Sequence, residues 1–253
     1  MNRHTDERHS AWTSGALHEP PRVRLPVMFQ NWCSLSFLHW RCDARMLQPR
    51  LPAGLTLDTF QEAGWIGMTP FRLTGLRPPG LPPLPGLSSF PETNLRTYVQ
   101  GPAGPGIWFF SLEAASTLAV WGARLGYGLP YHRARMTVRE APSHVEYRSA
   151  RPGASVSVDV RIGHPLSRPD ALTRFLTDRY RLYVRRLGRL VTAAVEHEPW
   201  PLREARLGRG EQTLTRWAGL PVDGPPDLVH YSPGVHTRIG APHATGARPR
   251  PTR

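Results

Sequence analysis

Residues 88–136 constrain the fold most, because they predict a strand, a glycine-proline turn, a second strand, a helix and a loop that leads into another strand. The first strand, residues 94–100, alternates in character. One face carries Leu95, Thr97 and Val99, and the other carries Glu92, Asn94, Arg96 and Tyr98. The second strand, residues 107–112, is apolar on both faces, which is typical of a strand buried on both sides. The polar row beside it is either a solvated sheet face or the lining of a cavity.

The length and composition predict a globular cytoplasmic protein. A chain of 253 residues with 40% hydrophobic and 20% charged residues is long enough for one large domain or two small ones. Residues 1–20 lack the apolar core of a secretory signal, and no apolar run approaches the ~20 residues of a membrane span. The two cysteines, Cys33 and Cys42, form no metal-binding motif, so we expect free buried thiols and no metal.

The basic residues restrict the chemistry. The net charge is +13 and all 32 basic residues are arginine. This surplus allows nucleic-acid binding as an alternative function, but the arginines are scattered and no nucleic-acid-binding motif is present. Because the chain has no lysine, it cannot form a Schiff base on a lysine of its own.

The remaining pattern predicts one α+β domain dominated by antiparallel sheet, spanning residues 22–240 between tails at 1–21 and 241–253. In the strand at 34–41, Leu35, Phe37 and His39 share a face. We expect a short helix after Asp43, a hairpin of residues 55–60 and 63–71, and an exposed loop or pocket flap at 75–87. Strands at 134–140, 144–149 and 155–162 form a meander, and another strand spans 190–198. A long helix at 169–188 with Asp170 at its start and Gly188 at its end has the expected apolar spacing, and residues 201–232 form short irregular elements.

The candidate site combines Glu92, Asn94, Arg96 and Tyr98 on one strand face with Tyr131 and His132 after the helix. An arginine suits a carboxylate ligand. A glutamate beside it can position the arginine or act as an acid or base, and Tyr98, Tyr131 and His39 can hydrogen-bond a carbonyl or enolate. The alternative is a Glu92–Arg96 ion pair on a solvated strand. Nucleotide-binding glycine loops, a GxSxG motif and an HExxH motif are absent from the sequence, and no cofactor is predicted.

Several runs, among them LSSFPETNLRTYV, PGIWFFSLEA and GLPYHRARM, resemble the YqjF-like family of uncharacterised bacterial proteins, DUF2071. The resemblance covers residues 29–239 and implies the acetoacetate decarboxylase-like fold, a closed antiparallel β-barrel or cone with two or three flanking helices. That fold would turn the Glu92–Tyr98 face into a cavity. Where acetoacetate decarboxylase carries two adjacent lysines after the proline, this chain has Tyr131 and His132. The resemblance therefore implies a similar cavity without decarboxylation through an imine.

The leading hypothesis is a protein that binds or transforms a small carboxylate or carbonyl compound, by lyase, hydratase or enolisation chemistry if it is an enzyme. Glu92, Tyr131 and His132 are the candidate catalytic residues, and Arg96, Asn94, Tyr98 and His39 are the candidate binding residues. The alternatives are a non-catalytic ligand-sensing or oligomerisation module, which includes a homo-oligomer, and nucleic-acid binding. A polar pocket of about 300 Å³ or more with Arg96 and Tyr131 would favour the first hypothesis. A dry interior filled by Trp108 would favour the module. The sequence does not specify the substrate.

Overall fold

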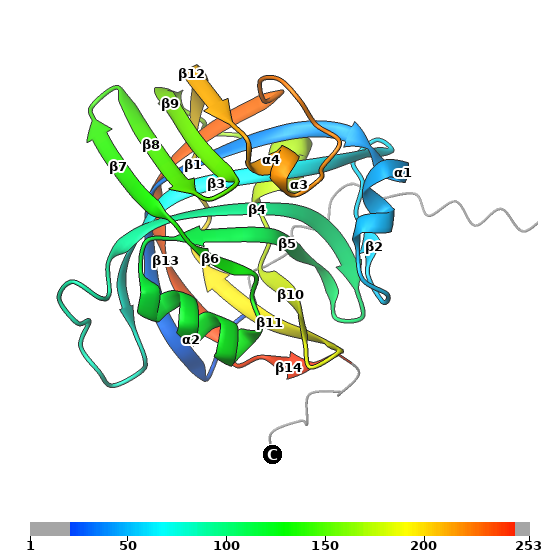
Figure 1. The fold of residues 1–253 in the computed structure, drawn as a ribbon, viewed down its shortest axis with the longest axis vertical. Helices are drawn as coiled ribbons and strands as arrows, with labels where there is room; N and C mark the ends of the chain where they lie inside the picture. Colours follow the sequence, from blue (N-terminus) through cyan, green and yellow to red (C-terminus); the bar gives the residue numbers. More distant parts are fainter. Residues whose placement is uncertain (1–20, 246–253) are drawn as a thin grey trace, which may run out of the picture.

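A closed ring of strands forms the centre of the computed structural model, which describes residues 21–245 (Figure 1). The ring closes because β11 pairs with both β10 and β13. In spatial order its strands are β11 (Arg189–His197), β10 (Arg181–Arg186), β5 (Gly104–Ala114), β4 (Phe90–Gly101), β3 (Ala63–Arg77), β1 (Pro26–Asp43) and β13 (Leu228–Gly240). The interior of this ring holds the candidate site.

Four further strands continue the sheet from β13 and fold over the outside of the ring. They are β12 (Arg203–Gln212), β9 (Ala154–Pro165), β8 (His144–Arg151) and β7 (Arg135–Ala141). The main apolar core lies between the two layers, where Leu38 and Met68 of the ring pack in one cluster with Tyr147 and Val158 of the outer strands. The short strands β2 (Thr56–Leu57), β6 (Tyr131–Arg133) and β14 (His243–Ala244) complete the sheet.

Helices are few and short. They are α1 (Ala44–Leu47), the 3-10 helix η1 (Gln48–Arg50), α2 (Thr117–Tyr127), α3 (Ala171–Thr177) and α4 (Leu214–Trp217). Helix α2 lies beside β5 and β6 at one end of the ring (Figure 1). Within residues 21–245, none of the helices has the length and apolar character that a membrane crossing requires. All pairings are antiparallel except those of β5 with β6 and β10, which confirms the predicted α+β class with mainly antiparallel sheet.

The predicted long helix at residues 169–188 is wrong in its second half. Asp170 caps α3 as expected, by accepting a hydrogen bond from the Thr173 backbone N–H. The helix ends at Thr177, and residues 181–186 form β10 instead. Leu187 and Gly188 have φ angles of 48° and 77°, so they form the tight turn of the β10–β11 hairpin. The apolar spacing of residues 172–187 is compatible with a helix, but residues 181–186 become a strand because they pair with β5 and β11.

Three other boundaries also differ from the prediction. Gln61 and Glu62 form the expected turn, with φ angles of 50° and 63°, but β2 pairs with β4 rather than with β3. Residues 201–232 contain the ten-residue strand β12 and the start of β13, not only irregular elements. In the predicted C-terminal tail, β14 pairs with β11. Residues 246–253, and residues 1–20 of the predicted N-terminal tail at 1–21, lie outside the described residues.

The loop at residues 75–87 is exposed at Leu81, Leu84 and Leu87, and none of its residues lines the ring cavity. This position favours the surface loop over the pocket flap. Cys33 and Cys42 are free, as predicted, but both are half-buried rather than buried.

Candidate functional site

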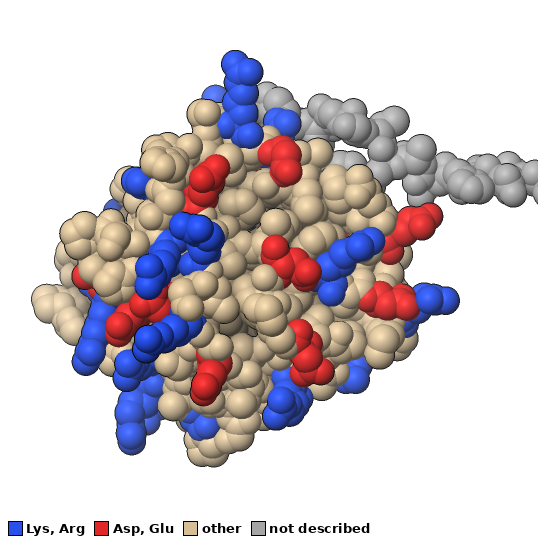
Figure 2. Space-filling model, turned by 90° about the horizontal axis from the view of Figure 1, so that it is seen from above, with Lys and Arg blue, Asp and Glu red and all other residues tan. Residues whose placement is uncertain are grey.

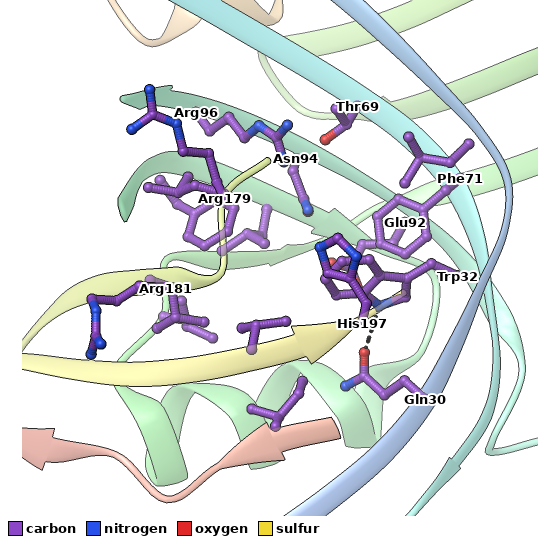
Figure 3. A pocket seen from close by; sticks show the side chains of 18 of the residues that line it. Gln30, Trp32, Thr69, Phe71, Glu92, Asn94, Arg96, Arg179, Arg181 and His197 are labelled. Atoms are coloured by element: carbon purple, nitrogen blue, oxygen red, sulfur yellow. Dashed lines mark hydrogen bonds between the residues drawn. The ribbon is translucent and has the colours of Figure 1, made fainter. Parts of the chain in front are cut away.

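The ring encloses a cavity of about 100 Å³ (Figure 3). All seven ring strands contribute lining residues, together with α2, α3 and β6. The cavity contains Arg96 and Tyr131, as the small-molecule hypothesis requires, but its volume does not reach the roughly 300 Å³ expected under that hypothesis. Trp108 does not line it and packs in a separate cluster with Val99 and Tyr183. The space therefore suits a ligand with only a few non-hydrogen atoms.

Strand β4 supplies the polar side of the cavity. Glu92, Asn94 and Arg96 all line it, as the alternating pattern of this strand predicts for residues on one face. The opposite face, with Leu95, packs in the apolar core between the layers. Thr69 of β3 stands directly across from Asn94 and also lines the cavity. The polar row of β4 is thus the lining of a cavity and not a solvated sheet face.

Unpartnered polar atoms are concentrated here. Among the described residues, nine buried side-chain polar atoms have no hydrogen-bond partner. Five of these atoms belong to residues that line the cavity: Thr69 Oγ1, Glu92 Oε2, Asn94 Oδ1, Arg96 Nε and Arg179 Nη2. A buried polar group without a partner costs about 1–3 kcal/mol, so such a cluster in one cavity indicates a place where a polar ligand completes the hydrogen bonding.

Arg96 is buried without a carboxylate. Its side chain is 7% exposed, and it forms no ion pair within residues 21–245. One terminal nitrogen donates a long hydrogen bond of 3.4 Å to the Leu176 carbonyl oxygen. The guanidinium carbon lies 5.5 Å from the ring centroid of Phe37 and 5.8 Å from that of Tyr98. A buried guanidinium with donors to spare is an anion-binding group.

Glu92 is buried beside Tyr131 and away from any cation that pairs with it among residues 21–245. The Tyr131 hydroxyl donates a hydrogen bond of 3.0 Å to Glu92 Oε1. Burial raises the pKa of Glu92 to about 8, although the hydrogen bond from Tyr131 acts in the opposite direction. At neutral pH this carboxyl group is therefore mostly protonated and can donate a hydrogen bond. Burial also raises the pKa of Tyr131, and the adjacent Glu92 adds to that effect.

His39 and Tyr98 lie behind Arg96 and do not line the cavity. Their side chains are fully buried, and His39 Nε2 lies 2.7 Å from the Tyr98 hydroxyl. Gly67 of β3 makes room for this pair, because a Cβ there would lie 2.9 Å from the Tyr98 oxygen. Both residues are thus placed to support Arg96 rather than to contact a ligand.

His132 does not belong to the cavity, although the sequence predicts it in the site. It sits on β6 opposite Glu113, and its ring packs edge-on against Trp217 with 5.1 Å between the centroids. Tyr131 and His132 are adjacent in an extended strand, so their side chains point to opposite faces. Only Tyr131 reaches the interior.

Most of the cavity residues were not expected from the sequence, and His197 and Arg179 are two of them. His197 lies at the end of β11, on the apolar face that also carries Val191 and Val195. A histidine that continues an apolar face is the signal that could have identified it. Arg179 follows α3, donates a hydrogen bond of 2.6 Å to Asp58 Oδ2 and keeps Nη2 unpartnered. Arg179 was missed because the predicted helix at 169–188 includes it, whereas α3 ends at Thr177.

Among residues 21–245, one group of side chains resembles a metal-binding set. His144, Glu146 and Asp159 on β8 and β9 hold their potential ligand atoms within 4.8 Å of one another. None of them lines the cavity, and Arg148 lies 4.0 Å from Glu146. This group is therefore separate from the candidate site.

The arginine surplus does not produce one continuous basic surface on the face seen in Figure 2. Arginine side chains there are interspersed with acidic ones. Ion pairs such as Arg72–Glu140, with 3.0 Å between nitrogen and oxygen, show the same mixture. This distribution gives no support to nucleic-acid binding through that face.

Comparison of structures supports the fold assignment. The structure of the enduracididine biosynthesis enzyme MppR complexed with pyruvate has a TM-score of 0.64 at 15% identity, over 92% of this chain and 93% of that one. An acetoacetate decarboxylase-like enzyme from Sphingomonas wittichii RW1 gives 0.62 at 15% identity, over 93% and 98% of the two chains. Acetoacetate decarboxylase from Legionella pneumophila gives 0.61 at 12% identity, over 90% and 92%. The fold is therefore acetoacetate decarboxylase-like.

Sequence comparison identifies the family. The uncharacterized protein YqjF of Bacillus subtilis (strain 168) is 38% identical over 211 residues, which cover 81% of this chain and 87% of YqjF. Residues 29–236 match the family DUF2071, which is described as an uncharacterized conserved protein. The chain belongs to the DUF2071 family.

Proposed function

We propose that the ring cavity binds a small carboxylic acid that carries an oxo or hydroxyl oxygen next to the carboxylate. The observation that carries this proposal is the group of five unpartnered, buried polar atoms of the cavity-lining residues. The carboxylate of the ligand would accept hydrogen bonds from the guanidinium groups. The ligand oxygen outside the carboxylate would lie at the end of the cavity near Glu92. The fold neighbour MppR, whose structure holds pyruvate, is a precedent for a ligand of this size in this fold.

Arg96 is the proposed anchor for the acid group. The pair of Arg179 with Asp58 is neutral overall, whereas Arg96 and Arg181 also line the cavity and form no ion pair within residues 21–245. Arg96 is the more buried of these two positive charges. Burying a charge without a partner is costly, and a bound carboxylate would relieve that cost. His39 and Tyr98 would then act as positioning residues that hold Arg96 in place.

Glu92 is the proposed hydrogen-bond donor to the carbonyl oxygen of the ligand. The Tyr131 hydroxyl already donates its hydrogen to Glu92 Oε1, so Tyr131 holds that carboxyl group in position. Because burial raises the pKa of Glu92 to about 8, its carboxyl group carries a proton at neutral pH. A donor at that oxygen would stabilise the negative charge that develops during enolisation. Since the chain contains no lysine, an imine with a lysine of this chain is excluded from the mechanism.

The test is a thermal-shift screen with pyruvate, 2-oxobutanoate, acetoacetate and lactate, on the wild type and on Arg96→Gln. A ligand at about 100 times its Kd adds about 2.7 kcal/mol to the stability of the folded state. We expect at least one acid to stabilise the wild type and to lose its effect in Arg96→Gln. Arg148→Gln, an exposed arginine on β8, is the matched control and should respond like the wild type. If no acid shifts the wild type, or if Arg96→Gln responds equally, the proposal fails.

Catalysis and ligand sensing are separated by deuterium exchange. An acid that binds is incubated with the protein in D₂O, and loss of the proton signal next to its carbonyl is followed by NMR. Exchange that requires Glu92 identifies an enzyme of the enolisation type. Binding without exchange identifies the non-catalytic ligand-sensing module.

A second candidate function, self-association, is favoured by one surface of α2. Leu118, Trp121 and Leu125 are 62%, 58% and 70% exposed, and their spacing of three and four residues places them on one face of the helix. Exposed apolar patches of this kind often mark contact surfaces. Sedimentation of the wild type and of Trp121→Glu at several concentrations tests whether this face joins two copies of the chain.

A further inference from the structure

The histidine that lines the cavity is held in a fixed orientation. The ring of His197 packs among aromatic neighbours, with centroid distances of 4.7 Å to Tyr180, 4.8 Å to Trp200 and 6.1 Å to Trp32. It extends from β11 toward the side chains of β4 (Figure 3). Its position is therefore set by packing before any ligand arrives.

One hydrogen bond determines which ring nitrogen of His197 carries the proton. Nδ1 lies 2.7 Å from the backbone carbonyl oxygen of Glu198. A carbonyl oxygen can only accept, so Nδ1 must be the protonated nitrogen. Burial lowers the pKa of His197 to about 4, and the nearby Arg96 acts in the same direction. At neutral pH the ring is therefore uncharged, and Nε2 presents a lone pair.

Nε2 differs in character from most of its polar neighbours in the cavity. It makes no hydrogen bond within residues 21–245, and it is not one of the nine fully buried unpartnered atoms, so part of its surface faces open space. As a lone-pair nitrogen it can only accept a hydrogen bond. Arg96 and Arg179 can only donate, and the protonated carboxyl group of Glu92 has a hydrogen to donate. The oxygens of a 2-oxo acid are all acceptors, so such a ligand satisfies the donors but offers nothing to Nε2. A hydroxy acid of the same size brings one O–H hydrogen.

We propose that His197 selects acids that carry a hydroxyl group, by accepting the hydroxyl hydrogen at Nε2 while Arg96 holds the carboxylate. This proposal rests on the proposed function, because it requires an acid bound at Arg96, and it refines the ligand class to small hydroxy acids. A site with a buried group aimed at a ligand hydroxyl discriminates against the analogue that lacks it, because the buried group is then left unpaired.

The test compares matched acids by isothermal titration calorimetry at pH 7, using the pairs lactate with pyruvate and 2-hydroxybutanoate with 2-oxobutanoate. We expect the wild type to bind the hydroxy acid about tenfold more tightly than its oxo partner. In His197→Asn, the side-chain amide nitrogen can keep the hydrogen bond to the Glu198 carbonyl oxygen, but the side chain no longer has an acceptor at the position of Nε2. In this variant the two acids of a pair should bind with affinities within about threefold of each other, and the affinity for pyruvate should change little.

His236→Asn is the matched control. His236 also contacts Glu198, with 2.7 Å between Nδ1 and Oε1, but its side chain is exposed and does not line the cavity. Its affinity ratio should equal that of the wild type. A merely structural role of His197 would weaken both acids of a pair together and leave their ratio unchanged.

The outcomes separate this inference from the proposed function. The inference is overturned if the wild type binds the oxo acid as tightly as the hydroxy acid, or if the ratio survives in His197→Asn. Binding of pyruvate that depends on Arg96 but shows no preference for lactate overturns the inference and keeps the proposed function. Failure of the wild type to bind any of the four acids overturns both.

Discussion

Glu92 and Glu113 are buried glutamates on neighbouring strands, and their surroundings differ sharply. Glu113 on β5 is 1% exposed and receives a two-pronged pair from Arg151, at 2.7 Å and 3.0 Å, together with a hydrogen bond of 2.7 Å from Ser111. Arg151 in turn stacks on Trp217, at 3.9 Å from the ring centroid. This cluster ties the β8–β9 hairpin to the ring and leaves neither carboxylate oxygen without a partner.

Glu92 on β4 is 3% exposed and has only Tyr131 as a hydrogen-bond partner among the described residues. The same chain thus provides a complete set of partners for one buried carboxyl group and an incomplete set for the other. Arginine is plentiful in the sequence, so the incomplete set does not reflect a shortage of cations. The difference indicates that the Glu113–Arg151 cluster stabilises the fold, whereas the ring interior keeps polar groups available for a ligand.

The largest expected effect tests the Glu113 side of this comparison. Arg151→Met leaves a buried carboxylate without its cation and should lower the free energy of unfolding by about 3–5 kcal/mol, measured by urea denaturation. The double variant Arg151→Met with Glu113→Gln should recover most of this loss, since no buried charge remains. The same replacement at Arg96 strands no carboxylate and should not lower stability. A loss at Arg151 below about 1 kcal/mol would remove the contrast.

The next effect tests the state of Glu92 through pH. Burial raises the pKa of Glu92 from 4.5 to about 8 in the folded state. Below about pH 4.5 the carboxyl group is protonated in both folded and unfolded chains, so it contributes no pH dependence. Between about 4.5 and 8 only the unfolded chain ionises, and the folded state loses about 1.4 kcal/mol per pH unit. Above about 8 the loss is constant.

Glu92→Gln removes this loss. At pH 7 the variant should be more stable than the wild type by about 3 kcal/mol, and the difference should vanish near pH 4. The amide oxygen can still accept the hydrogen bond from Tyr131. Glu62→Gln, in the exposed turn before β3, is the control and should follow the wild-type curve. Parallel curves for Glu92→Gln and the wild type across this range would mean that the carboxyl group is not protonated in the cavity.

The polar side of the cavity was the part of the site that sequence could predict. A strand has a period of two, so the alternation of residues 92–98 places Glu92, Asn94 and Arg96 on one face whatever the rest of the fold does. Whether that face is solvated depends on ring closure through the pairing of β11 with β13, residues that are about 40 positions apart. Only the family resemblance, through its implied fold, pointed to a closed interior.

The missed residues share this long-range origin. Arg179 reaches the cavity because β10 runs parallel to β5, a pairing that local apolar spacing does not report and that the predicted helix contradicts. His197 faces the cavity because β11 closes the ring. Tyr98 shares its strand face with Arg96, yet it packs behind that residue against His39, a side-chain contact between strands that are 59 positions apart at these residues.

The smallest expected effect tests the single partner of Glu92. Tyr131→Phe removes the hydrogen bond to Glu92 Oε1 and should lower the free energy of unfolding by about 1 kcal/mol. That hydrogen bond lowers the pKa of Glu92, so its loss should raise the pKa above the wild-type value of about 8. The fall in stability with pH should then continue to a higher pH than in the wild type.

Tyr127→Phe is the matched control, because Tyr127 lines the cavity but donates its hydrogen bond to the Gly240 carbonyl oxygen at 3.3 Å. Tyr127→Phe should lose a similar amount of stability, but the pH at which stability stops falling should be the same as in the wild type. An unchanged pH profile in Tyr131→Phe, or one that ends at lower pH, would show that the tyrosine does not tune Glu92, and the acid in the cavity would have to be explained by burial alone.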